Sequence, residues 1–152
     1  MLKEYSNAPV QEVTMAVHFE PIAMLNTINL VGRCYDLASQ LDNYSIEEAP
    51  RQEVRLESEQ YRPQISSFKI HAGASEIGCA LLSQDKSESI QIQNNRFAVT
   101  WVRQDNASYP RYDSLKPAFF ERLELFRSSI FNMKDVSLNI VQSGIQYVNQ
   151  VD

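Results

Sequence analysis

The sequence predicts an α+β domain: a two-layer fold with a mostly antiparallel sheet of about six to seven strands and two helices packed on one face. Three observations predict it, namely strand-like alternation at both ends of the chain, helical spacing in two separate segments, and several short strand-like runs between those segments. The expected order is β-α-β-β-β-β-β-α-β, and short turns between successive strands favour antiparallel pairing. Because no linker or internal repeat is visible, we expect residues 1–152 to form a single α+β domain.

The first strand is expected at residues 10–19, where apolar and polar side chains alternate. Glu20-Pro21 is then expected to open a helix that continues to Leu41, because proline is tolerated in a first helical turn. Apolar residues recur at helical spacing in this segment and predict a broad buried face. That face comprises Met24, Ile28, Val31, Tyr35 and Ala38, joined by Leu25, Leu30, Cys34, Leu37 and Leu41.

The middle of the chain predicts short strands and turns. Residues 43–50 are interpreted as a connection. The charge-alternating run at residues 51–59 predicts a strand with one solvated face or an exposed edge strand, and an exposed edge allows a homo-oligomer to form. Further strands are expected around Phe68 and Ile70 and at residues 76–83.

The clearest hairpin is centred on Asn94-Asn95, because alternation continues on both sides of it, from Ile90 to Trp101. A tight two-residue turn commonly demands positive φ, which asparagine tolerates. Trp101 ends the apolar face of this hairpin and is interpreted as a core or rim anchor, with ligand stacking as the alternative.

A corner at Tyr109-Pro110-Arg111-Tyr112 precedes a second amphipathic helix. Asp113 is expected to cap this helix, which begins near Ser114 and places Pro117 in its first turn. Its inner stripe is Leu115, Phe119, Leu123, Phe126 and Ile130, reinforced by Phe120. The final run, from Val136, changes phase at Ser143-Gly144, which predicts a bulge or a bend inside a long strand.

Composition narrows the classes of function. With 43% hydrophobic residues and no long apolar segment or signal-like start, the chain is expected to be a cytoplasmic protein without a membrane segment. Its 14 basic and 19 acidic residues give a formal net charge of -5, which argues against a general phosphate-binding surface. Cys34 and Cys79 lie in apolar patterns and are interpreted as buried hydrophobic side chains.

No motif for catalysis, a cofactor or a metal is present in the sequence. His18 and His71 fall in no metal-ligand spacing, and the four glycines are too dispersed for a phosphate-binding loop. Paired glutamates at residues 47–48 and 57–59 lie in charge-alternating segments, which are typical of a solvated face. We therefore predict no catalytic, cofactor-binding or metal-binding residues, and an enzyme is the less favoured class.

The chemically richest cluster combines Trp101, Arg103, Tyr109, Arg111 and Tyr112. Arginine and aromatic side chains offer planar surfaces with polar tips, which anchor protein interfaces or stack on bases. The alternative is structural, with Pro110 fixing the turn and Tyr112 packing beneath the helix. Arg103, Tyr109 and Arg111 are the candidate partner-binding residues.

Four segments resemble a family of uncharacterised prokaryotic proteins of sporadic distribution. They are the NAPxxEV segment from Asn7, the RFxxxW segment from Arg96, YPRY from Tyr109, and YVN from Tyr147. Members of that family continue well beyond the YVN segment, so the resemblance implies either that this chain covers their N-terminal part or that it is a short relative. It implies no established activity, and a sporadic distribution is compatible with accessory genes for defence or toxin immunity.

Three functional hypotheses follow. The first is a non-enzymatic interaction or regulatory domain that binds a protein partner near the corner and the end of the last strand. The second is a sensor of a small molecule or nucleotide, with a pocket between sheet and helices lined by Tyr35, Phe119 and Trp101. The third is single-stranded nucleic-acid binding by the aromatic-arginine cluster, which the negative charge disfavours.

Overall fold

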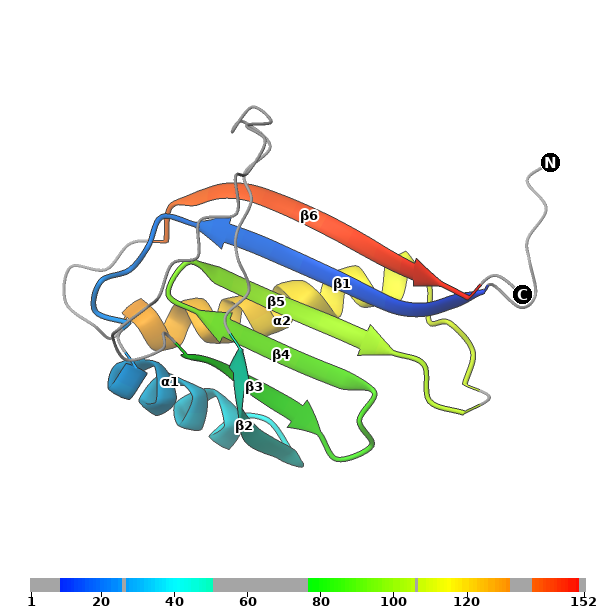
Figure 1. Ribbon diagram of the computed structural model, residues 1–152, viewed down its shortest axis with the longest axis horizontal. Coiled ribbons are helices and arrows are strands. Elements are labelled where there is room, and N and C mark those ends of the chain that lie inside the picture. Colours follow the sequence, from blue (N-terminus) through cyan, green and yellow to red (C-terminus); the bar gives the residue numbers. More distant parts are fainter. Residues whose placement is uncertain (1–8, 26, 51–76, 106, 132–137, 151–152) are drawn as a thin grey trace, which may run out of the picture.

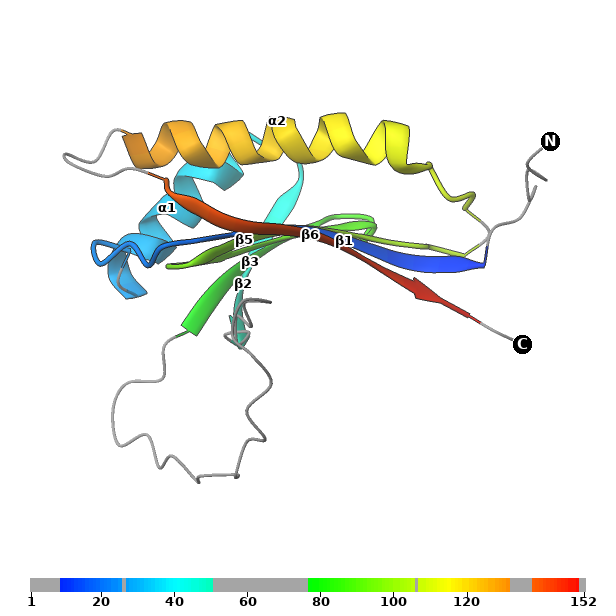
Figure 2. The same cartoon turned by 90° about the horizontal axis from the view of Figure 1, so that it is seen from above.

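Six strands form one antiparallel sheet, and two helices lie on one face of it (Figures 1 and 2). The computed structural model describes residues 9–25, 27–50, 77–105, 107–131 and 138–150. The α+β prediction is confirmed. The elements in chain order are β1 (Val10–Phe19), α1 (Thr27–Ser39), β2 (Tyr44–Pro50), β3 (Ile77–Ser83), β4 (Glu88–Gln93), β5 (Arg96–Val102), α2 (Tyr112–Phe131) and β6 (Ile140–Asn149).

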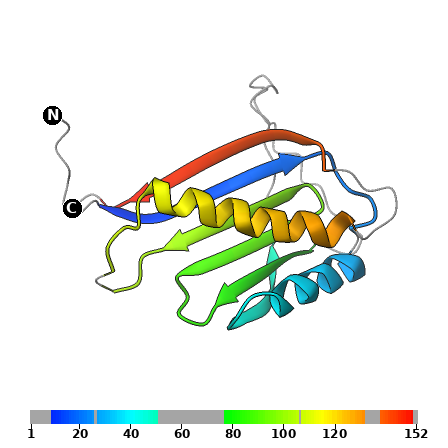
Figure 3. The ribbon, with the colours of Figure 1, turned by 180° about the vertical axis from the view of Figure 1, so that it is seen from behind.

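The strand order is β2-β3-β4-β5-β1-β6, so the first and last strands of the chain are neighbours. β1 pairs with β5 on one side and β6 on the other, and Val13 lies opposite both Trp101 and Tyr147. α2 crosses the sheet in front of β5 and β1, whereas α1 lies beside β2 and β3 (Figure 3). The described sheet therefore has two edges, β2 and β6.

The core lies between the sheet and the helices, as the alternation in residues 10–19 predicts. Val13, Met15, Val17 and Phe19 are buried, and their polar neighbours point to the other face. Aromatic rings fill the centre, where Phe97 and Phe126 stack with their centroids 5.0 Å apart. The buried stripe of α2 is also as predicted.

The start of the first helix was predicted wrongly. α1 begins at Thr27, and the segment that follows Pro21 forms a turn instead. Ile22 is buried, and its N–H donates to the carbonyl oxygen of Asn94 at 2.8 Å. This contact with the β4–β5 hairpin holds the segment out of the helical conformation.

Only half of the predicted apolar face of α1 is buried. Leu30, Cys34 and Leu37 face the sheet, whereas Ile28 and Tyr35 are 83% and 63% exposed. The two stripes are offset around the helix, and a helix packed on a sheet turns only one side toward it. The stripe that contains Ile28 and Tyr35 therefore remains largely on the surface.

The interpretation of residues 43–50 as a connection is wrong, because Tyr44–Pro50 forms the strand β2. Tyr44 and Ile46 are partly buried against the core, and Glu47 is exposed, as expected for an edge strand. The strands expected at residues 51–59 and around Phe68 and Ile70, with the homo-oligomer edge placed at 51–59, lie outside the described residues.

The hairpin at Asn94-Asn95 is confirmed, with Gln93 paired to Arg96. Neither asparagine has the positive φ that was expected. Their carbonyl oxygens instead accept hydrogen bonds from the N–H groups of Ile22 and Phe19, at 2.8 and 3.1 Å. Tertiary hydrogen bonds thus stabilise this turn.

Three details of the C-terminal half also differ from expectation. α2 begins at Tyr112, so Asp113 lies within the first turn and Pro117 beyond it, and Phe120 is 54% exposed. No bulge occurs at Gly144, which pairs regularly with Ala16. The register shifts at the two ends of the β1–β6 pair, where the ladder adjusts without interrupting its centre.

Candidate functional site

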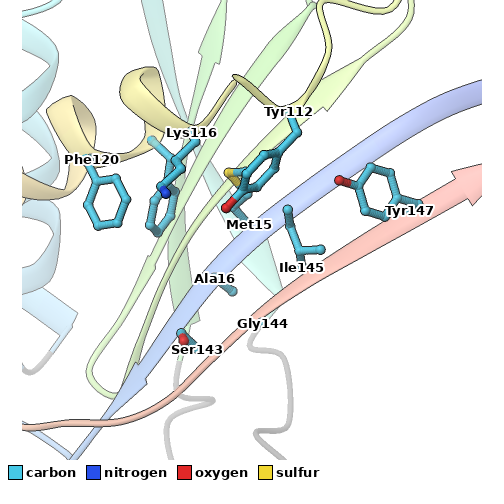
Figure 4. A pocket seen from close by; sticks show the side chains of 10 residues that line it. Met15, Ala16, Tyr112, Lys116, Phe120, Ser143, Gly144, Ile145 and Tyr147 are labelled. Carbon is cyan, nitrogen blue, oxygen red and sulfur yellow. The ribbon is translucent and has the colours of Figure 1, made fainter. Parts of the chain in front are cut away.

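The candidate site is a groove of about 550 Å³ between α2, β1 and β6, which we name the α2–β6 groove (Figure 4). It lies on the helix-covered face of the sheet, beside the β6 edge. Its lining residues are Met15, Ala16, Tyr112, Lys116, Phe119, Phe120, Ser143, Gly144, Ile145 and Tyr147.

The groove follows from the spacing of residues on α2 and β6. Phe119 belongs to the buried stripe of α2, while Tyr112, Lys116 and Phe120 recur every four residues along the adjoining side of the helix. Ile145 lies opposite Met15 in the sheet, so its side chain is on the helix-covered face. One exposed row on a helix and one on a strand thus face a common hollow.

The walls of the groove are largely apolar. Among the described residues that line it, Lys116 is the only charged one, and its Nζ lies 5.7 Å from the centroid of the Tyr112 ring. This cation–π contact holds the ammonium group against the wall. Apolar groups are therefore the ligand chemistry that the groove favours.

β6 itself is exposed along nearly its whole length. Five of its apolar side chains are at least 40% exposed: Ile140, Val141, Ile145, Tyr147 and Val148. Its sequence, IVQSGIQYVN, holds no charged residue. Of these, Ile145 and Tyr147 share the helix-covered face, and exposed apolar side chains that gather on one face mark interaction surfaces.

The predicted residue Tyr109 connects the corner to this strand. Its ring lies 5.7 Å from that of Trp101, and its side chain is hydrogen-bonded to Tyr147. Burial raises the pKa of Tyr109 to about 12, with further contributions from the Tyr147 hydrogen bond and from Asp113. Tyr109 thus positions one end of β6.

The two predicted arginines occupy different places. Arg111 is exposed, with a φ of 65°, and its carbonyl oxygen accepts the N–H groups of Ser114 and Leu115 at the start of α2. Arg103 follows β5, and its N–H donates to the carbonyl oxygen of Gln11 at 2.8 Å. Neither arginine lines the α2–β6 groove.

The pocket expected from Tyr35, Phe119 and Trp101 does not form as described. Tyr35 lies on the outer side of α1, and Trp101 is not among the residues that line the α2–β6 groove. Phe119 alone of the three contributes to it. The offset between the two apolar stripes of α1 is the reason that Tyr35 points away.

A second, polar pocket of about 820 Å³ lies near the β3–β4 turn. There the Tyr44 hydroxyl donates to Glu88 at 2.8 Å, and the Nε of Arg122 lies 3.0 Å from the same carboxylate. Burial makes the largest contribution to raising the pKa of Tyr44 to about 12, and the hydrogen bond to the Glu88 carboxylate adds to it. Because each group is already paired, this network ties β2, β4 and α2 together.

The described histidine, His18, and the two cysteines agree with a structural role, whereas His71 lies outside the described residues. Burial and the neighbouring Arg96 guanidinium lower the pKa of His18 on the face away from the helices. Cys34 and Cys79 are buried and unbonded by any disulfide, as predicted. Within the described ranges, no three His, Cys, Asp or Glu side chains come together as metal ligands.

Comparison with models of known protein families, with curated proteins and with solved structures gives no match. The resemblance to a sporadically distributed prokaryotic family therefore stays a prediction. In the part of the chain that the structure describes, no helix has the length and apolarity needed to span a membrane.

The groove and the β6 edge were not anticipated from the sequence as one site. The signal available was the uncharged strand at residues 140–149, which contrasts with a chain that is 22% charged. In a sequence, an uncharged final strand together with a helix that has apolar residues outside its main buried stripe predicts such a groove.

Proposed function

We propose that the chain is a non-enzymatic interaction domain that binds a protein partner in extended conformation along β6. The observation that carries this proposal is the combination of an exposed, uncharged edge strand with the apolar α2–β6 groove beside it. An added strand gains affinity from main-chain hydrogen bonds and specificity from pockets that take alternate side chains.

The geometry matches both requirements of such a mode. Ser143, Ile145 and Tyr147 lie on the helix-covered face, so alternate side chains of an added strand on that face extend beside the groove. Tyr112 and Phe120 provide apolar walls there. The corner at Tyr109 and Arg111 lies near the Tyr147 end of the strand and extends this surface.

A small-molecule sensor is the second candidate function. The groove volume of about 550 Å³ lies in the range typical of small-molecule pockets, which supports it. Native mass spectrometry of the purified chain distinguishes this candidate, because a ligand retained through purification adds its own mass.

Panning a random linear peptide library against the chain, immobilised at low density so that each molecule presents its own β6, tests the proposed function. We expect peptides with alternating apolar residues to be enriched on the wild type and lost on Ile145→Lys. Ile28→Lys makes the same chemical change at an exposed position of α1 and should bind like the wild type. Equal enrichment on all three baits, or none on the wild type, contradicts the proposal.

The corner is tested separately with Arg111→Ala. Arg111 is exposed and contacts the helix start through its carbonyl oxygen, which the substitution retains. We expect weaker binding of an enriched peptide with a nearly unchanged thermal midpoint. A variant that binds fully removes the corner from the interface and leaves β6 as the binding surface.

A further inference from the structure

β6 lacks most of the features by which natural edge strands avoid pairing with other chains, and its register shifts only near the ends of the β1–β6 pair. Such edges are commonly short or carry charges, prolines or bulges. β6 runs for ten residues, and its sequence holds no Lys, Arg, Asp, Glu or Pro. No other described strand pairs with its outer side.

The register of β1 shows which of its main-chain groups bond toward β6. The N–H of Phe19 donates to Asn95 at 3.1 Å, and the N–H of Arg103 donates to Gln11 at 2.8 Å. Odd-numbered residues of β1 thus bond toward β5. Because alternate residues of an antiparallel strand bond to opposite neighbours, even-numbered residues such as Ala16 bond toward β6.

The same alternation assigns the outer edge of β6. Ala16 pairs with Gly144, so the main-chain groups of Gly144 point inward to β1. Those of Ser143, Ile145 and Tyr147 consequently point outward. The outer edge therefore presents a regular series of donors and acceptors, with no bulge in the centre of the strand.

We infer that this edge pairs with a second copy of the chain, β6 against β6 in antiparallel orientation, about a two-fold axis at Ile145. The inference rests on the proposed function, because it names the partner that binds the same edge. Ile145 then lies opposite its counterpart, and Tyr147 lies opposite Ser143. A two-fold axis makes the interface self-complementary, and about six main-chain hydrogen bonds join the two copies.

Side-chain size and charge favour this occupant. On the helix-covered face a large tyrosine lies opposite a small serine, and on the other face Gln146 lies opposite Gly144. Such cross-strand pairs fit without steric conflict. Each copy carries a net charge of -5, yet the strand is neutral, so pairing places no like charges opposite each other.

The dimer also covers apolar surface that one copy leaves exposed. Ile145 and Tyr147 are 40% and 41% exposed, and in the dimer both lie on the helix-covered face of the joined sheet, next to the paired strands. The two α2–β6 grooves become neighbours on one continuous sheet, flanked by the two α2 helices. The buried area thus comes from side chains as well as from the paired main chains.

Sedimentation velocity of the full chain, at concentrations from micromolar to submillimolar, tests the dimer. We expect the wild type to sediment as a dimer and Ile145→Lys as a monomer with an unchanged circular dichroism spectrum. Ile28→Lys, the matched change on α1, should remain dimeric. A wild type that is monomeric throughout, or an Ile145→Lys variant that still dimerises, overturns the inference.

A distance measurement tests the register independently. A spin label at Asn149→Cys should give about 27 Å between the two labelled Cα positions, because eight residues separate them along paired antiparallel strands. Cys34 and Cys79 are buried, so a brief reaction labels the introduced exposed thiol before either of them. A separation of a few ångströms indicates a parallel pair and overturns the arrangement.

The outcomes separate this inference from the proposed function. Peptide enrichment on the wild type together with a monomeric chain in solution shows that β6 binds a foreign strand, and overturns only the homodimer. Failure of both experiments removes the edge as an interaction surface altogether.

Discussion

The two edges of the sheet differ in how they meet solvent. β2 carries Glu47 and Glu48 and ends at Pro50, all residues that discourage further strand pairing. β6 carries none of these and is longer, with ten residues against seven. Within one sheet, therefore, one edge is chemically protected and the other is suited to association.

The two edges are also held by different contacts. Tyr44 of β2 is hydrogen-bonded to Glu88, which is paired with Arg122, and α1 packs against the same strand. Tyr147 of β6 is hydrogen-bonded to Tyr109 in the corner. The protected edge thus has a partly buried ionic anchor, whereas the open edge has a neutral one.

The largest expected effect is on the core that both edges share. Phe126→Ala should lower the free energy of unfolding by about 3–5 kcal/mol, because it removes a fully buried ring that stacks on Phe97. Hydrogen exchange should then accelerate in β2 and β6 alike. Phe120→Ala, on the exposed side of α2, serves as the control and should change stability little; protection lost at one edge alone would contradict a shared core.

A smaller effect compares the two anchors through the same chemical change. Tyr44→Phe should cost about 1.5–3 kcal/mol, because it removes a hydrogen bond to a partly buried carboxylate, whereas Tyr147→Phe should cost about 0.5 kcal/mol. Urea unfolding of both variants measures the difference. Equal losses would mean that the two edges are fixed equally well.

Glycine replacement is expected to stabilise both sides of the molecule. A Cβ at Gly32 in α1 or Gly144 in β6 would meet no atom within 4 Å. Gly32→Ala should raise stability by about 1 kcal/mol, and Gly144→Ala by about 0.5 kcal/mol, because alanine loses less backbone entropy on folding. Thermal unfolding checks both values, and a destabilised Gly144→Ala would indicate that the edge needs glycine.

A separate effect, confined to alkaline solution, is the dependence of stability on pH. Folding raises the pKa values of Tyr44 and Tyr109 from 10.0 to about 12, so the folded chain keeps phenol protons that the unfolded chain releases. Stability should be unaffected below pH 10 and should fall as the pH rises toward 12. The loss of stability with rising pH should be less steep in Tyr44→Phe and in Tyr109→Phe than in the wild type. If both variants lose stability as steeply as the wild type, other titrating groups cause the loss.

The sequence predicts the fold where one periodicity is unambiguous. β1, the β4–β5 hairpin and the inner stripe of α2 were each predicted correctly, because a single apolar face leaves one choice of orientation. α1 offers two apolar stripes, and only contact with the sheet decides between them. In residues 43–50 only Tyr44 and Ile46 pack against the core, and the segment also contains two glutamates. Its apolar alternation is therefore too short to predict a strand.

The candidate site was not predicted from the sequence. Arg103, Tyr109 and Arg111 do not line the α2–β6 groove and stay predicted partner-binding residues, although Tyr109 contacts Tyr147 on the strand that we propose as the interface. The α2–β6 groove combines residues from three distant segments, and their proximity depends on the pairing of β1 with β6. Local patterns carry no information on that pairing, which is why Ile145 and Phe120 were not predicted as site residues.

The two buried thiols, Cys34 and Cys79, allow separation of α1 from the sheet to be measured by their chemical reactivity. Cys34 on α1 and Cys79 on β3 are 0% and 4% exposed, and the Cys79 contact together with burial raises the pKa of Cys34, so its thiol stays protonated. Since only a thiolate reacts with thiol reagents, modification must wait until α1 separates from β3. The rate of labelling in native buffer therefore measures the population of that opened state without any engineered probe.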